Sequence, residues 1–144
     1  MEKIKIYMIG NTHIDPVWMW EKAEGMQEVK STFISALDRL DEFQEFRFTQ
    51  SSVAFLEWMK DNCPEQFERI RQKVSEGCWD IVGGMWIEPD CDIPSGESMV
   101  RHFLYSKKFV KENFGKDVLT TYNVDSFGHG SNMPAICSGC GIKY

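Results

Sequence analysis

The sequence lacks any apolar run near the roughly 20 residues that a membrane-spanning helix needs. Its N-terminal stretch, MEKIKIYMIG, has too short an apolar segment for a secretory signal peptide and no small-residue cleavage site. Basic residues are also scarce, since 16 lysines and arginines stand against 22 acidic residues, for a net charge of −6. Because no basic cluster is present either, we expect neither nucleic-acid nor membrane partners.

Cysteines are few and odd in number. Five cysteines in 144 residues suit a reducing compartment better than a disulfide framework, so we expect a cytoplasmic location. Cys137 and Cys140 form a CxxC pattern, but without a second pair they cannot make a four-cysteine zinc site. Gly139 between them indicates a helix terminus rather than a redox centre.

What the sequence does contain is an alternation of strand and helix patterns. Strands are expected at 4–9, 46–49, 79–82, 118–124 and, at its entry, 141–144, and helices at 26–40, from 51 or 52 through 59, 64–76, 95–114 and 131–138. This alternation predicts an α/β fold with a parallel sheet and helical crossovers. Because so few strands do not close a barrel, we expect residues 1–144 to be the N-terminal part of an incomplete (β/α) barrel built from parallel βα repeats.

The segment after the first apolar run combines His13 and Asp15. In an extended segment, side chains two residues apart project to the same side, and Pro16 favours that extension. Imidazole and carboxylate are both common zinc ligands, so the pair suggests a divalent metal site. A single His-x-Asp also occurs by chance in many globular proteins, and the pair alone does not decide between these interpretations.

Two further loops follow expected strands and carry similar groups. The carboxyl ends of parallel strands meet at one edge of a sheet, where reactive residues of βα folds gather. The candidates in these loops are Glu88, Asp90, Asp125 and His129. Asp125 could instead cap the following helix or turn, and for the two acids at 88 and 90 we favour an ordinary solvated loop position. For His102, inside a helix, we favour a surface or satisfied role.

Three sequence motifs occur along the chain in this order: THIDPVWMW, VGGMWIEPDCDIPSGESMVRH and DSFGHGSNMPAI. Together they resemble the N-terminal catalytic region of the retaining α-mannosidases of glycoside hydrolase family 38, from Ile6 to Tyr144. The resemblance implies that His13 and Asp15 are zinc ligands, that Asp125 is both a third ligand and the nucleophile, and that Trp18 lines the mannose subsite. Cobalt or manganese would also suit these ligands.

The resemblance also implies a substrate and an incomplete site. The substrate would be an α-linked mannoside in an oligosaccharide or glycoconjugate, and a homo-oligomer of the full-length protein stays open. The family uses a further histidine ligand and a separate general acid/base, both well downstream of its DSFGH-like segment. Because this chain ends 19 residues after Asp125, we expect it not to turn over substrate alone.

Two other functions fit the same residues. A metal-dependent deacetylase or hydrolase on a related βα scaffold would use the metal to activate water, but such enzymes usually add histidines in H-x₃-H spacing, which this sequence lacks. A non-catalytic module that binds carbohydrate or zinc is the second alternative.

Overall fold

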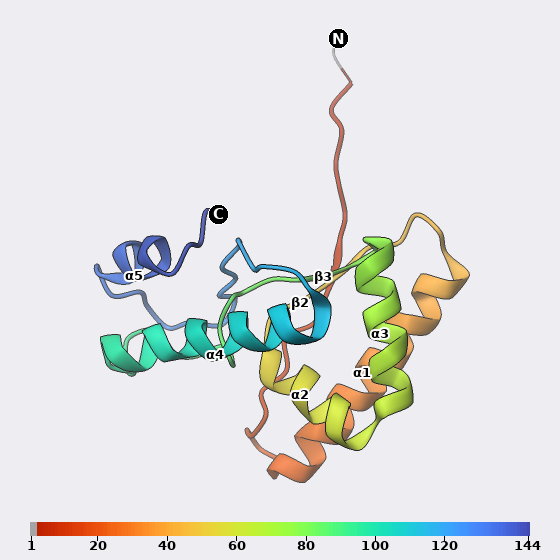
Figure 1. Cartoon of the computed structure of the whole chain (residues 1–144), viewed down its shortest axis with the longest axis horizontal. Coiled ribbons are helices and arrows are strands. Elements are labelled where there is room, and N and C mark those ends of the chain that lie inside the picture. Colours follow the sequence, from red (N-terminus) through yellow and green to blue (C-terminus); the bar gives the residue numbers. More distant parts are fainter. Residues whose placement is uncertain (1–2) are drawn as a thin grey trace.

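The computed structural model describes residues 3–144, which form an α/β fold around a small parallel sheet (Figure 1). The sheet has three strands in the order β1-β2-β3, namely β1 Gly10–Asn11, β2 Phe48–Gln50 and β3 Trp79–Ile81. Both neighbouring pairs are parallel. The prediction of a parallel sheet with helical connections is therefore confirmed.

The helices occupy the positions that the apolar spacing predicts. They are α1 Lys22–Glu42, α2 Val53–Asn62, α3 Pro64–Glu76, α4 Gly96–Phe114 and α5 Met133–Gly139. Their ends follow local chemistry: Pro64 opens α3, where its missing N–H has no helical partner to lose, and Gly77 closes it with φ of 77°. Ser95 caps α4 by accepting a hydrogen bond from the Ser98 amide at 3.2 Å.

The main core lies where α1, α2 and α3 pack on the sheet and on one another (Figure 1). Trp79 of β3 is fully buried and contacts Phe33 of α1 edge-on, with ring centroids 5.3 Å apart. The ring centroid of Phe48 in β2 lies 4.5 Å from that of Trp79. Helix α4 joins this core through Val110. The apolar stripes read from the sequence are therefore the faces that hold the sheet in place.

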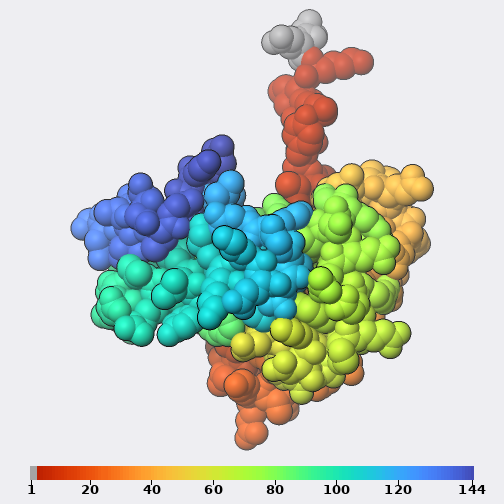
Figure 2. Space-filling view, viewed as in Figure 1, coloured from red at the N-terminus to blue at the C-terminus, as the bar shows by residue number. Residues whose placement is uncertain are grey.

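The prediction of a strand at 4–9 is wrong, because these residues do not pair with the sheet. Residues 3–9 stand clear of the packed body as the red segment of Figure 2, and Ile4 and Met8 are 90% and 92% exposed. Only Gly10–Asn11 pairs with β2. Alternating apolar residues favour a strand, but a strand forms only where a neighbouring backbone accepts its hydrogen bonds, and no described residue does so for this segment.

The strands expected at 118–124 and 141–144 are not formed either. Their backbones do meet: Lys143 N–H donates to Leu119 O at 2.7 Å, and Thr121 N–H donates to Tyr144 O at 2.8 Å. These few bonds do not extend into a regular ladder.

Among the helices of residues 3–144, none is both long and apolar enough to cross a membrane.

Candidate metal centre

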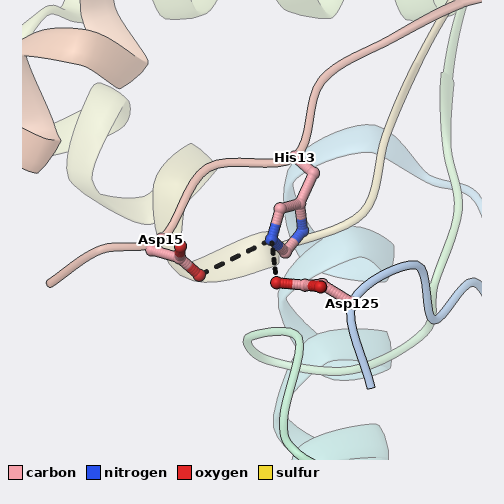
Figure 3. Close-up of side chains that lie close together, drawn as sticks. All are labelled: His13, Asp15 and Asp125. Atoms are coloured by element: carbon pink, nitrogen blue, oxygen red, sulfur yellow. Dashed lines mark ion pairs between the residues drawn. The ribbon is translucent and has the colours of Figure 1, made fainter. Parts of the chain in front are cut away.

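Three side chains meet beyond the end of β1, two from the loop that follows this strand and one from a segment more than 100 residues further along the chain. The Nε2 atom of His13 lies 3.5 Å from Asp15 Oδ1 and 3.6 Å from Asp125 Oδ2 (Figure 3). One potential ligand atom from each residue lies within 4.8 Å of the other two. The convergence that the loop positions suggested is therefore observed, and we call these three residues the metal-site cluster.

The loop that carries His13 and Asp15 is held by one contact within itself and one with α1, neither of which the sequence revealed. The indole Nε1 of Trp20 donates to the carbonyl oxygen of Asp15 at 3.0 Å, which fixes the backbone of a cluster residue. Pro16 passes so close to α1 that a side chain at position 25, where Gly25 stands, would overlap the carbonyl oxygen of Pro16. A helix glycine thus allows the close approach of the loop.

The segment carrying Asp125 is tied to the sheet from both sides. Just before it, the Tyr122 hydroxyl donates to Asn11 Oδ1 at 3.1 Å, which links it to β1. Just after it, the Ser126 hydroxyl donates to Pro89 O at 3.4 Å, which links it to the loop after β3. These contacts explain how a residue outside any regular strand reaches the imidazole of His13.

The charges in the cluster are unbalanced. Three carboxylates, from Asp15, Glu88 and Asp125, contact the single imidazole of His13. Across residues 3–144, none of these carboxylates forms an ion pair with a lysine or arginine. A divalent cation is the group that would relieve this repulsion, and one imidazole with two carboxylates is a donor set that zinc accepts. The residues present therefore fit the metal.

The cluster opens into a cavity of about 750 Å³, a size that suits a small ligand. Trp18 lines this cavity and is 62% exposed, with its ring edge-on to Trp20 at 5.4 Å. The side chain of Asp125 is 57% exposed and also faces the cavity. No lysine or arginine is among the lining residues, which are His13, Ile14, Asp15, Trp18, Trp20, Glu24, Glu28, Thr32, Asp125 and Phe127.

Glu88 is the residue that the sequence interpretation placed wrongly. We expected a solvated loop acid, but its side chain is only 11% exposed, and Oε2 lies 2.5 Å from His13 Nδ1. The sequence signal for this contact is the place of Glu88 in the loop that follows β3. Asp90 and His129 are not part of the metal-site cluster, and His129 is exposed and lines a different cavity.

The CxxC pair takes no part in the cluster. Cys137 and Cys140 are both free thiols at the end of α5. Burial raises the pKa of both thiols, which keeps them protonated and weakly nucleophilic. This agrees with the expectation that the pattern marks a helix terminus.

Comparison with known proteins assigns this chain to one family over nearly its whole length. The family described as the glycosyl hydrolases family 38 N-terminal domain matches residues 3–144. The chain belongs to glycoside hydrolase family 38. Alpha-mannosidase G of Dictyostelium discoideum is 34% identical to this family 38 chain over 139 residues, and Alpha-mannosidase 2C1 of Homo sapiens is 36% identical over 138 residues. Each alignment covers 96% of the chain but 13% of the relative.

The family 38 assignment extends to the fold. The crystal structure of an alpha-mannosidase from Enterococcus faecalis V583 has a TM-score of 0.83 with this chain at 24% identity, over 93% of this chain and 15% of that one. This likeness shows a shared fold. The chain spans 13% of the length of each of these two alpha-mannosidases, so the activity of the whole protein is a matter for proposal.

Proposed function

We propose that this chain carries part of the active site of a zinc-dependent retaining α-mannosidase. The observation that carries the proposal is the position of His13 Nε2, which faces Asp15 and Asp125 at 3.5 and 3.6 Å. Family 38 membership supports the reaction class, because the matched relatives are named alpha-mannosidases. The substrate would be an α-linked mannoside in an oligosaccharide or glycoconjugate.

In this proposal, Asp125 is the nucleophile. Retaining glycosidases use one ionised carboxylate to attack the anomeric carbon and a second carboxyl group, about 5 Å away, to protonate the leaving oxygen. Asp125 suits the first role because its carboxylate is exposed to the cavity and has no lysine or arginine partner in residues 3–144. Bound zinc would supply the positive charge that keeps this carboxylate ionised.

The other residues of the site would bind the zinc ion and orient the sugar. His13 and Asp15 would be zinc ligands, and Trp18 would present its ring to the sugar C–H groups from the wall of the same cavity. Cobalt or manganese is chemically compatible with the same donors. We place the fourth ligand and the general acid/base outside residues 1–144, so these residues alone are proposed not to turn over substrate.

We also propose the fold and the cellular location of the full-length protein. The parallel strands β1, β2 and β3 would be the first part of a (β/α) barrel in the full-length protein. All five cysteines are unpaired, which supports a cytoplasmic location.

The test compares variants of the full-length protein with zinc and an aryl α-mannoside. Asp125→Ala and His13→Ala are expected to lose about 1,000-fold or more in kcat, as is usual when a nucleophile or its support is removed. Asp80→Ala, which removes an exposed carboxylate on β3, is the matched control and should act as wild type. Undiminished release of the aryl group by Asp125→Ala would overturn the nucleophile assignment.

A second measurement separates the alternatives. NMR of the first sugar product should show retained configuration at the anomeric carbon. Inverted product would favour direct attack by water, as in a metal-dependent hydrolase. Zinc binding without any mannoside cleavage by the full-length protein would instead favour a non-catalytic carbohydrate- or zinc-binding module.

A further inference from the structure

Glu88 holds the side of the His13 ring that points away from the metal-site cluster. Its Oε2 atom lies 2.5 Å from Nδ1, while Nε2 faces Asp15 and Asp125. A carboxylate can only accept a hydrogen bond, so Nδ1 carries the proton and donates it. The lone pair of the neutral ring is then on Nε2, the atom that faces the two aspartates.

We propose that Glu88 is a positioning residue that sets the tautomer and the angle of His13 for metal binding. This inference rests on the proposed zinc site and adds a residue to it that touches neither metal nor sugar. Histidine ligands generally donate their second ring N–H to a carboxylate or carbonyl, and this partner makes the ring a better ligand.

Glu88 is itself held in place by the end of β2. The Ser51 hydroxyl donates to its Oε1 atom, and its backbone N–H donates to Ser52 Oγ at 3.2 Å. Both serines are buried. The Ser52 hydroxyl therefore holds this loop, and it makes no capping hydrogen bond to α2, which it precedes. With both carboxylate oxygens and its amide engaged, Glu88 has one orientation.

The loop packing adds to this rigidity. Ala54 N–H donates to Trp86 O at 2.7 Å, so the loop after β3 runs alongside the start of α2. Gly83, with φ of 87°, lies so close to Ser51 that a Cβ atom there would be 2.8 Å from the Ser51 carbonyl oxygen. Residues from the ends of all three strands thus combine to aim one imidazole.

A purely structural role for Glu88 predicts a different result from a positioning role. If the contact only joined two loops, its loss would lower stability with or without metal. If it orients His13, its loss lowers metal affinity while the metal-free protein keeps its fold. Measuring zinc affinity and metal-free stability on the same variants separates the two.

The experiment uses the full-length protein, stripped of metal and titrated with zinc in competition with a chromophoric chelator. Glu88→Gln keeps the shape of the side chain and should weaken zinc binding about 10- to 100-fold. Ser51→Ala should weaken it less, because only one support of the carboxylate is lost. Asp90→Asn, in the same loop but outside the cluster, is the matched control and should bind zinc as wild type.

Thermal unfolding of the metal-free proteins completes the test. Similar unfolding temperatures for wild type and Glu88→Gln, together with weaker zinc binding, support the proposal. Zinc affinity equal to that of wild type in Glu88→Gln overturns the proposal. The proposal also fails if metal-free Glu88→Gln is unfolded, so that its loss of zinc binding follows from the lost fold, and Ser51→Ala binds zinc normally. If His13→Ala binds zinc as wild type does, the zinc site itself fails, which is a distinct outcome.

Discussion

Gly25, in the first turns of α1, lies directly against the carbonyl oxygen of Pro16 in the loop that carries His13 and Asp15. A Cβ atom at this position would overlap the backbone of Pro16 and would lie 3.1 Å from the indole Nε1 of Trp20. The metal-site loop and the helix that follows it are therefore fitted to each other through the absence of one side chain.

Gly25→Ala is expected to destabilise the protein and to shift this loop. Helix propensity alone would favour alanine by about 1 kcal/mol, but overpacking against rigid backbone costs about 1–3 kcal/mol, so the clash should decide the sign. Thermal unfolding and zinc titration of the full-length protein measure the two effects. Gly139→Ala in α5, where a Cβ atom meets nothing within 4 Å, is the control and should not destabilise. A Gly25→Ala protein as stable as wild type would contradict the close contact.

Removal of the metal should abolish cleavage of an aryl α-mannoside. The carboxylates of Asp15, Glu88 and Asp125 surround one imidazole and have no lysine or arginine partner among residues 3–144, so the metal-free cluster lacks its balancing charge. Dialysis against a chelator should lower kcat more than about 100-fold, and added zinc should restore it. Elemental analysis gives the metal content. Full activity in protein containing almost no metal would exclude the proposed cofactor.

Trp18→Ala should weaken substrate recognition more than chemistry. The ring lies exposed in the wall of the cavity, where its flat apolar face can pack against the C–H groups of a sugar. We expect KM to rise about 3- to 10-fold with kcat less affected, which steady-state kinetics on the full-length protein can separate. Trp18→Phe keeps an aromatic face and should recover most of the loss. Unchanged KM in Trp18→Ala would remove this residue from the subsite.

His102 should make the stability of the protein fall in mild acid. Burial lowers the pKa of its imidazole, and a hydrogen bond to the backbone of Ile87 opposes this only in part. Nδ1 of the ring is also buried without a partner among the described residues. Because the folded pKa lies below the unfolded value of about 6.5, the unfolded chain takes up a proton first as the pH falls, and folding loses stability from there downward.

The measurement is thermal unfolding of metal-free wild type and His102→Gln between pH 8 and pH 5. The stability advantage of wild type over the variant should shrink as the pH falls through about 6.5, since glutamine does not titrate. The other histidines of the chain, His13 and His129, are present in both proteins and cancel in the comparison. An advantage that stays constant over this range would show that the ring is not held neutral.

Helices and strands differed in how well local sequence predicted them. All helices of residues 3–144 were predicted from apolar spacing and end signals such as Pro64 and Gly77, because a helix forms its hydrogen bonds within its own segment. The strand at 4–9 was not formed, because a strand depends on a partner that lies elsewhere in the chain. Alternation of apolar residues does not reveal whether that partner is in reach.

The same distinction applies to the site. The sequence by itself determined that His13 and Asp15 could act together, since two residues of extended chain put them on one side, and its motifs led to family 38. The motifs also named Asp125, but only the tertiary structure showed that Glu88 contacts His13. Glu88 lies 75 residues from His13 along the chain, and its burial comes from contacts with Ser51 and Ser52 at the end of another strand. Such contacts arise from packing between elements, which no local pattern encodes.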